Sequence, residues 1–470
     1  AMNRIITFLL CATSLLACDF TSSPEERMLE YALRQAGDNR KELEYVIEHY
    51  EGDSLRREAA CFLIRNMVYH FGFDKRDKVP DITSISSSYL INNIELAFQV
   101  WPKPWNRNVC FNDFCRYILP YRSLHEHPSS LRETLMKTYL PLLDSLHINN
   151  TYDAVMTMQK ILKTRVAYHE VIPQYYPTAE EIHETGLGRC DGMVMYGVNM
   201  MRAVGVPTVA EHTIWTRRNS EHYWCAFLND DGKFLPFAPE NEGPDSLIYN
   251  LTRPFLTPAK IYRYGFAPFE PVILESSDEY RTFLKNPLLT AVTEQYLPPV
   301  TDIQTICDFP VKSEKAPVYL CTYNYKNWRP FALSERIGKQ CAFSKIVGDD
   351  VFIIAEYDKD THGFLRFITY PFHVSANGII TKIKPDSTHF ESIFINSDNA
   401  YQQKVPHTLC YWEQEQQCFK TGHFPMETLP KGIIIRDIPK GSLLKGMISW
   451  PGKAAEDRIF LIDNDTIKRY

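Results

Sequence analysis

The chain has 470 residues, of which 44% are hydrophobic and 23% are charged, and its formal net charge at pH 7 is -6. This length exceeds what a single hydrophobic core usually serves, and the composition is that of an ordinary globular protein. The acidic balance, without long runs of like charge, argues against a nucleic-acid-binding protein.

The first residues have the pattern of an export signal. Arg4 supplies a positive charge, and residues 5–16 form an apolar stretch that is too short to span a bilayer. The sequence from Leu15 to Cys18 (LLAC) resembles a bacterial lipobox. We therefore expect residues 1–17 to be a signal peptide and Cys18 to be the lipid anchor of an exported protein, on the periplasmic or cell-surface face of a bacterial cell envelope. The alternative is an ordinary secretory signal with an incidental cysteine.

Residues 18–165 are predicted to be helical. Leu43, Val46, Ile47 and Tyr50 follow the i, i+3, i+4, i+7 spacing of one helix face. A glycine then interrupts this helix, and prolines mark irregular connections between the later ones. We expect a helical region ahead of the rest of the chain.

Residues 166–292 are predicted to mix helices and strands. Thr178 and Glu181 form a capping-box pattern that opens a short helix, which Gly186 can end. A second helix is expected over residues 190–203, because a glycine and a proline follow it closely.

Two strands and a hairpin follow these helices. Residues 208–214 and 221–228 have strand composition. Residues 229–232 (NDDG) are a hairpin turn signal, and residues 233–237 form the expected return strand.

From residue 293 to the end the pattern is all-β. Short apolar runs are separated by turn residues at irregular intervals, as in β-sandwich proteins. Two β-rich domains, 293–388 and 389–470, fit the length better than one. The predicted fold class is therefore a multidomain α+β protein with a helical N-terminal region, an α+β core and a C-terminal β-sandwich region.

Ten cysteines follow Cys18, and their scattered spacing indicates no dense disulfide framework. An exported location permits disulfides, with Cys110–Cys115 or Cys410–Cys418 as candidate pairs. No spacing typical of zinc ligands is present. We expect neither a metal nor an organic cofactor.

Cys190 is the candidate nucleophile. It stands in GLGRCDG (residues 186–192) at the predicted start of a helix, where unpaired N–H groups and the positive dipole end stabilise a thiolate. Gly188 and Gly192 would let a substrate carbonyl approach closely. His222 follows 32 residues later on a predicted strand and would act as base and acid. A buried core cysteine and a hydrogen-bonded strand histidine are the alternatives.

The predicted hairpin determines what lies opposite this histidine. If Leu228 pairs with Lys233, His222 lies opposite Pro239. An acidic or amide residue within 238–241 would then be placed to orient the imidazole.

These motifs resemble the transglutaminase-like (papain-like) superfamily of cysteine enzymes. The similar parts are Gly-Arg-Cys190-Asp-Gly, the helix end over residues 201–207 (MRAVGVP) and His222-Tyr-Trp, all within residues 175–245. Sequence on both sides resembles bacterial lipoprotein members. The resemblance implies a core in which the cysteine starts a helix packed on a sheet, while a histidine and an aspartate come from neighbouring strands.

One position departs from the family pattern. Members often carry an aspartate in a Pro-x-Asp-Pro type stretch on the return strand, whereas residues 235–240 of this chain are LPFAPE. Ala238 occupies the aspartate position. Glu240 is expected to replace it, with Asn241 as an alternative. A missing third residue would leave a weak enzyme or a non-catalytic domain.

Two further residues are candidates for binding substrate. Arg189 would bind a substrate carboxylate, or it pairs with Glu184. Trp224 would contact substrate, or it packs beneath His222.

Together these features predict an exported, lipid-anchored cysteine hydrolase or acyltransferase that acts on amide bonds of a peptide, protein or cell-wall-like substrate. Hydrolysis is favoured, because water is the default acceptor in an exposed cleft. The alternative is a catalytically weak or inactive fold that serves as a peptide- or glycan-binding surface lipoprotein, as Ala238 suggests. The expected partners are the substrate and, through the lipid anchor, a membrane, but no nucleic acid. The sequence sets no oligomeric state.

Overall fold

A computed structural model describes most of the chain after the predicted signal peptide and Cys18, which lie outside the described residues. The described residues are 23–74, 77–170, 177–241, 243–253, 255–269, 286–297, 300–312, 317–334, 336–358, 360–361, 365–396, 409–448, 456–464 and 466–470. No helix among them is long and apolar enough to cross a membrane.

The described residues form two compact units. The first contains the residues up to Ala210 together with Cys225–Asn241 and Tyr264–Phe269. The second contains Glu211–Trp224, the residues between 242 and Arg263, and those from 286 to Tyr470. The predicted domain limits at 165/166, 292/293 and 388/389 stay predictions.

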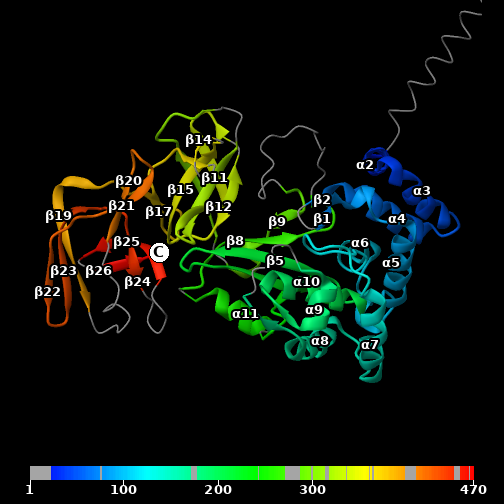
Figure 1. The fold of residues 1–470 in the computed structure, drawn as a ribbon. Helices are drawn as coiled ribbons and strands as arrows, with labels where there is room; N and C mark the ends of the chain where they lie inside the picture. The colour runs from blue at the N-terminus through cyan, green and yellow to red at the C-terminus, as the bar shows by residue number, and fades with distance from the viewer. Residues whose placement is uncertain are drawn as a thin grey trace, which may run out of the picture. The chain divides into compact units, whose positions relative to one another are not determined.

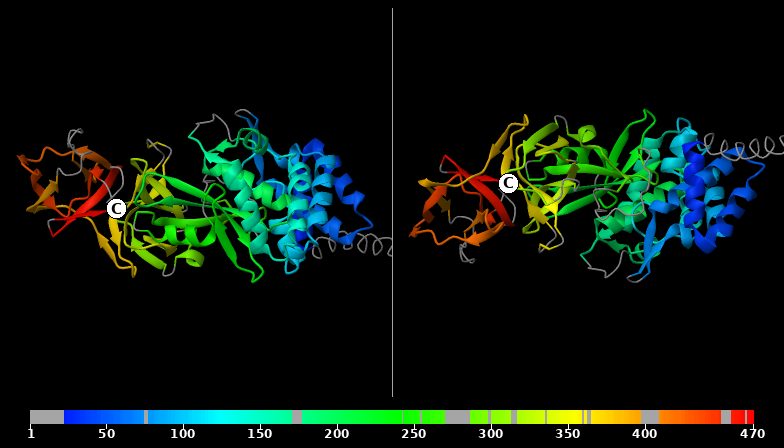
Figure 2. Two further views of the ribbon diagram at one scale, coloured as in Figure 1. Left: turned by 90° about the horizontal axis from the view of Figure 1, so that it is seen from below. Right: turned by 90° about the horizontal axis from the view of Figure 1, so that it is seen from above.

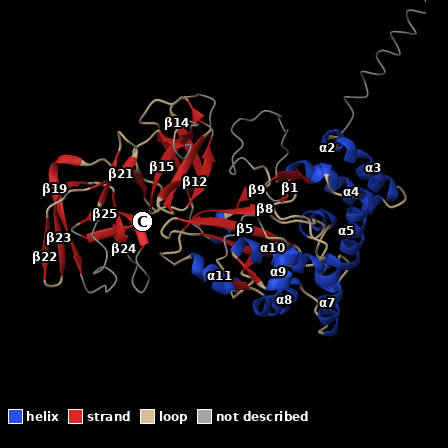
Figure 3. Cartoon of the chain, viewed as in Figure 1, coloured by secondary structure: helices blue, strands red, loops and turns tan. Residues whose placement is uncertain are grey.

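The fold class is α+β, as predicted, with helices in the N-terminal part and strands towards the C-terminus (Figures 1 and 3). The N-terminal helices are α2 (Pro24–Gln35), α3 (Arg40–His49), α4 (Ser54–Asn66), α5 (Ser87–Val100), α6 (Phe111–Tyr117), α7 (Arg132–Ser145) and α8 (Thr151–Arg165). A hairpin that the sequence did not predict, β1 (Phe71–Asp74) with β2 (Asp77–Pro80), interrupts them. Figure 2 shows these helices, in blue to cyan, from two further directions.

Apolar faces and side-chain caps explain these helices. Leu43 and Val46 on α3 are fully buried in a core shared with α2, α4 and α5, which confirms the predicted face. Asp53 caps α4, because its Oδ1 accepts the Arg56 N–H at 3.0 Å.

Two buried arginines tie this region to the end of α10 (Cys190–Ala203). Arg202, in the last turn of α10, donates to the carbonyls of Arg122 at 2.7 Å and Thr208 at 2.9 Å. The Arg122 guanidinium in turn donates to Asp81 at 2.6 Å and is 1% exposed. The neighbouring Tyr121 is also buried and donates to Asp81. These groups are therefore part of the core.

The core sheet has the strand order β7-β6-β5-β8-β9. Its strands are β5 (Thr208–Trp215), β6 (Glu221–Leu228), β7 (Phe234–Phe237), β8 (Pro258–Tyr264) and β9 (Leu289–Ala291). The other elements of the central part are β3 (Ala167–Tyr168), α9 (Ala179–Thr185), β4 (Leu187–Gly188), α10, α11 (Pro244–Leu251) and α12 (Thr293–Tyr296). The predicted α9, α10, β5, β6 and β7 are all present.

The register of the predicted hairpin was wrong by one residue. Leu228 pairs with Phe234, not with Lys233, and the ladder ends at Cys225 opposite Phe237. The turn is longer than predicted because the Asn229 N–H donates to the Lys233 carbonyl at 2.8 Å. The ladder therefore assigns no partner to residues beyond Phe237.

Gly186 fixes the approach to α10. It ends α9 in the left-handed conformation (φ 69°), as predicted, and a Cβ there would lie 2.6 Å from the Arg165 carbonyl oxygen. Just after these two residues, β3 pairs in parallel with β4, with Tyr168 opposite Gly188. The chain entering α10 is thus held against the end of α8 by backbone packing.

The C-terminal part is built from β strands. They are β10 (Thr301–Ile306), β11 (Val318–Asn324), β12 (Asn327–Ser334), β13 (Arg336–Ile337), β14 (Gln340–Ile346), β15 (Asp350–Tyr357), β16 (Leu365–Phe367), β17 (Phe372–Val374), β18 (Ile380–Lys382), β19 (Asp386–Asn396), β20 (Cys410–Glu413), β21 (Cys418–Thr421), β22 (Met426–Leu429), β23 (Gly432–Lys440), β24 (Leu444–Ile448), β25 (Glu456–Asp463) and β26 (Thr466–Arg469).

These strands form sheets that pack face to face, as in sandwiches. Sheet β10-β14-β13 covers one face of the six-stranded sheet β12-β11-β15-β17-β18 with β16, and Phe343 and Phe352 share that core. Sheet β21-β20-β24-β25-β26 covers the opposite face, where Tyr323 and Trp412 meet. The remaining sheet, β19-β23-β22, packs against β24 and β25.

Neither candidate pair forms a disulfide in the described structure. Cys410 pairs with Thr421 and Cys418 with Glu413 across β20 and β21, so the two cysteines are out of register. Cys110 instead donates to the Asp113 carboxylate at 3.2 Å.

Replacing Gly186 by alanine should destabilise the first unit more than replacing Gly232. Both glycines have positive φ, but a Cβ at Gly232 would meet nothing within 4 Å. We expect Gly186→Ala to lower the free energy of unfolding by about 3 kcal/mol and Gly232→Ala by about 1 kcal/mol, because only the first adds a backbone clash to the left-handed strain. Urea unfolding followed by circular dichroism measures both, and equal losses would contradict the close approach to Arg165.

Candidate active site

Cys190 is the first residue of α10 and is half-buried. Arg189 precedes the helix with extended backbone (φ -72°, ψ 172°), and its carbonyl accepts the Met193 N–H at 3.0 Å. The sulfur therefore starts a helix of 14 residues, whose positive dipole end favours a thiolate over a thiol. This is the helix start that the sequence predicted.

Arg189 is the more exposed member of an ion pair next to this cysteine. Its guanidinium lies 2.7 Å from the Asp191 carboxylate, and its side chain is 41% exposed against 11% for Asp191. Asp191 also accepts the Gly192 N–H at 3.0 Å. A binding role for Arg189 stays a prediction, and its exposure leaves the guanidinium accessible.

Packing against α9 explains both glycines that flank Cys190. A Cβ at Gly188 would lie 2.8 Å from the Ile182 side chain, and one at Gly192 would lie 3.0 Å from Pro177 and 3.4 Å from Ile182. Both directions are filled by the protein itself. The expectation that these glycines make room for a substrate carbonyl is therefore not needed to explain them.

A third glycine lets α10 pack closely on β6. A Cβ at Gly197 would lie 3.1 Å from the Cys225 sulfur and 3.1 Å from Pro239. The Cys225 thiol is buried and lies 3.6 Å from the Val194 carbonyl. Cys225 is thus a packing residue beneath the helix.

His222 is the second residue of β6, is half-buried, and has two indole rings close to its own. Its ring centroid is 6.1 Å from that of Trp215, nearly parallel to it, and 5.9 Å from that of Trp224. Burial lowers the pKa of His222 to about 4, with smaller contributions from His212 and Arg218. The imidazole is therefore neutral at pH 7 and available as a proton acceptor.

Trp224 belongs to a buried polar cluster that the sequence analysis missed. Trp224 is 0% exposed, and its indole N–H donates to Glu211 at 2.7 Å. Glu211 also accepts from Tyr296 at 2.8 Å and from Arg263 at 2.8 Å. A substrate could reach Trp224 only if this core opened. Trp224 is therefore a packing residue in this structure. A glutamate inside the predicted strand over residues 208–214 was the signal for this cluster.

The candidates for the third catalytic residue follow the end of the return strand, β7, and each has different surroundings. Ala238 is buried, and its carbonyl accepts from Gln159 at 3.3 Å. Glu240 is half-buried just beyond the end of β7. The carbonyl of Asn241 accepts from Lys163 at 3.5 Å.

Cys190 lies in the first unit and His222 in the second, and their pairing stays a prediction. Within the described ranges, no group of three or more His, Cys, Asp or Glu side chains is arranged to hold a metal ion.

Comparison with known proteins gives a family for part of the chain. No curated protein matches it. One similar solved structure, described as that of a candidate cysteine protease from Cytophaga hutchinsonii, has 18% sequence identity and a TM-score of 0.22. That match covers 27% of this chain and 43% of the other, so it spans less than half of that protein. Residues 144–239, which include Cys190 and His222, match the family model of the transglutaminase-like superfamily. This segment therefore belongs to the transglutaminase-like superfamily, as the sequence motifs predicted.

Proposed function

We propose that the protein is a cysteine hydrolase or acyltransferase that acts on amide bonds through Cys190 and His222. The observation that carries this proposal is the position of Cys190, half-buried at the first residue of α10 inside the family-matched segment. The positive end of the helix dipole favours ionisation of a thiol at a helix start.

In the proposed reaction the neutral His222 imidazole takes the Cys190 proton as the sulfur attacks the amide carbonyl carbon. The C–N bond then breaks, and the imidazolium gives its proton to the leaving amine. Backbone N–H groups at the start of α10 would stabilise the oxyanion. Water then attacks the thioester in hydrolysis, or an amine attacks it in acyl transfer, and Cys190 is restored.

The low pKa of His222 fits the role of a base that is neutral at rest. The loss of water around the half-buried ring disfavours an isolated imidazolium. A thiolate on Cys190 would be the compensating charge during turnover. Glu240 is proposed to orient the ring, and Arg189 to bind a substrate carboxylate.

The proposed substrate is a peptide, a protein or a cell-wall-like polymer, with hydrolysis favoured over cross-linking. The proposed location is the bacterial cell envelope, with Cys18 as the lipid anchor. Both proposals rest on the sequence patterns. Ala238 favours a second candidate function, a peptide- or glycan-binding lipoprotein that keeps the fold without turnover.

Cys190 should be the most reactive thiol in the folded protein. We expect iodoacetamide at pH 7 to modify Cys190 at least tenfold faster than Cys110 or Cys418, which are exposed but lie outside the family-matched segment. Peptide mass spectrometry over time measures all three rates in one sample.

Cys190→Ala is the matching variant. Because the side chain is half-buried, the melting temperature should change by less than about 2 °C, while any amidase activity is lost. Alkylation of Cys190 no faster than that of Cys110 would sink the enzyme proposal. A large loss of stability would instead identify Cys190 as a core residue.

The pKa of His222 should depend on Cys190. In Cys190→Ala we expect the imidazole to titrate near pH 4, since burial disfavours its charged form. In the unmodified protein the pKa should be higher, because a nearby thiolate favours the imidazolium. Nuclear magnetic resonance of labelled histidine, assigned with His222→Gln, measures both values. Equal pKa values would rule out the proposed pair.

A further inference from the structure

The loop that leads to His222 is held by distant parts of the C-terminal sequence. Strand β5 ends at Trp215 and β6 begins at Glu221, so residues 216–220 form the connection, here called the 216–220 loop. The Trp215 N–H donates to the Ser220 carbonyl at 3.2 Å and closes the base of the loop. His222 is the second residue after this loop, and its position follows from where the loop ends.

Asn324, at the end of β11, holds both ends of the loop. Its amide nitrogen lies 2.7 Å from the Trp215 carbonyl, 2.8 Å from that of Arg218 and 2.9 Å from that of Ser220. Asn324 is 0% exposed, so these carbonyls have a fixed donor away from solvent. The two N–H bonds of one amide group are thus shared among three carbonyls, two in the loop and one on the residue before it.

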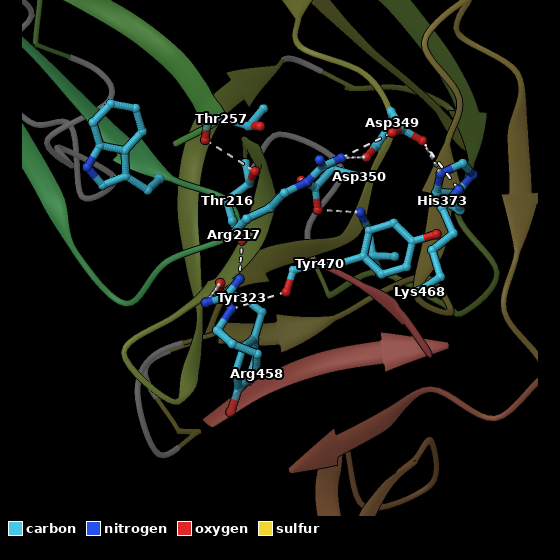
Figure 4. A network of polar contacts seen from close by, with 12 residues as sticks. Thr216, Arg217, Thr257, Tyr323, Asp349, Asp350, His373, Arg458, Lys468 and Tyr470 are labelled. Atoms are coloured by element: carbon cyan, nitrogen blue, oxygen red, sulfur yellow. Dashed lines mark hydrogen bonds and ion pairs between the residues drawn. The ribbon is translucent and has the colours of Figure 1, made fainter. Parts of the chain in front are cut away.

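Arg458, on β25, binds the loop at its first residue, Thr216, and at Asn219. Its guanidinium donates to the Thr216 carbonyl and, at 2.9 Å each, to the Asn219 side chain and the Tyr323 carbonyl. Its Nε donates to the Tyr470 carbonyl at 3.1 Å, and the arginine is 2% exposed. Figure 4 shows Arg458 reaching towards Thr216 beside Tyr323 and Tyr470.

Further groups bind the loop side chains. Arg217 pairs with Asp349 and Asp350, each at 3.2 Å (Figure 4). The Asn219 backbone N–H donates to Glu456 at 2.7 Å, and its side chain donates to the Asp457 carbonyl at 3.2 Å. The loop is therefore bound by three separate stretches of the C-terminal sequence.

Two of the contacting turns have unfavourable backbone geometry. Asp349 has φ 60°, and Tyr325 and Lys326, which follow Asn324, have φ 49° and 67°. Residues other than glycine rarely adopt a positive φ unless the surrounding structure enforces it. The Tyr325 N–H donates to the Asn219 side chain at 3.1 Å, so the turn geometry is used to hold the loop.

The contacts continue to the histidine through Trp215. Its carbonyl is fixed by Asn324, and its ring lies nearly parallel to that of His222 at 6.1 Å. We infer that the C-terminal β strands position His222 through the 216–220 loop, and that Asn324 and Arg458 are positioning residues for the proposed reaction. This inference rests on the proposed function of His222.

Asn324→Asp tests the inference with almost no change in shape. The carboxylate cannot donate to three carbonyls and would repel them, so the loop should move. We expect the His222 ring resonances and pKa to change and the rate of Cys190 alkylation to fall at least tenfold. The matched control is Asn327→Asp, an exposed asparagine on the same hairpin, which should behave like the unmodified protein.

Asn219→Ala, a smaller change, decides the question if Asn324→Asp fails to fold. It removes the acceptor for Arg458 and Tyr325 and should also shift the His222 resonances, while circular dichroism stays unchanged. Unchanged His222 resonances in a folded Asn324→Asp or Asn219→Ala protein would overturn the inference. The histidine readout needs no turnover, so an inert Cys190 in the unmodified protein would count against the proposed function and leave this test intact.

A different observation concerns two thiols between the sheets. The sulfur atoms of Cys307 and Cys341 lie 3.4 Å apart, and both residues are buried. The Cys307 N–H donates to the Lys339 carbonyl at 2.9 Å, and this bond holds the two cysteine-containing segments together. We propose that Cys307 and Cys341 form a disulfide on exposure to a small disulfide oxidant. One thiolate attacks the oxidant and displaces half of it as a thiolate, and the second cysteine then displaces the other half. The disulfide forms as the oxidant's S–S bond breaks, and the two electrons and the two cysteine protons end on the two small thiols that are released.

Incubation with oxidised glutathione followed by non-reducing peptide mapping tests this proposal. We expect the peptides containing Cys307 and Cys341 to become linked and the melting temperature to rise, both reversed by dithiothreitol and absent in Cys341→Ser. Cys410 and Cys418, which are out of register, serve as the internal control. Linkage of Cys307 to Cys341 no greater than that between Cys410 and Cys418 would overturn it.

Discussion

The packing that fixes the first turn of α10 is the constraint on which the candidate nucleophile depends. Gly186 allows backbone to approach backbone at Arg165, and Gly188 and Gly192 allow α9 to press Ile182 against the turn that carries the cysteine. Farther along the helix, Gly197 brings it onto Cys225. A Cβ would lie 2.6 and 2.8 Å from a neighbour at Gly186 and Gly188, and 3.0 and 3.1 Å at Gly192 and Gly197, so a methyl group at each position would force its neighbours to shift. The close packing that orients the helix dipole at the sulfur thus depends on the absence of side chains at these four glycines.

Electrostatics along α10 agree with this packing. Its C-terminal turn carries Arg202, a buried cation that is satisfied by backbone carbonyls. A cation at that end complements the negative end of the helix dipole, just as a thiolate complements the positive end. In the second unit, Glu211 is buried but compensated by Arg263, so it is tied up in structure. For His222, burial is the largest effect on the pKa, and His212 and Arg218 lower it further.

Local sequence signals predicted the helices and strands well, but they did not predict the hairpin register or the contacts between distant segments. The helix from Cys190 to Ala203 and the strand from Glu221 to Leu228 follow from composition, caps and punctuation by glycine and proline. The hairpin register failed because the turn closes one residue wider than its sequence signal indicates, and turn chemistry alone does not set that width. The roles of Asn324 and Arg458 could not be predicted, since their partners lie more than a hundred residues away in sequence. Nothing local marks a buried amide that serves three carbonyls.

The interlocking of distant segments has a consequence for how the molecule can be divided. The family-matched segment ends at residue 239, yet the donors that satisfy its 216–220 loop come from residues 324 and 458. A fragment cut at the edges of the matched segment would expose those carbonyls to water and release the chain around Trp215. Homology limits and folding limits therefore differ here. Any shortened version intended for crystallisation or inhibitor screening has to retain the distal β strands, although no sequence motif marks them as part of the same folding unit.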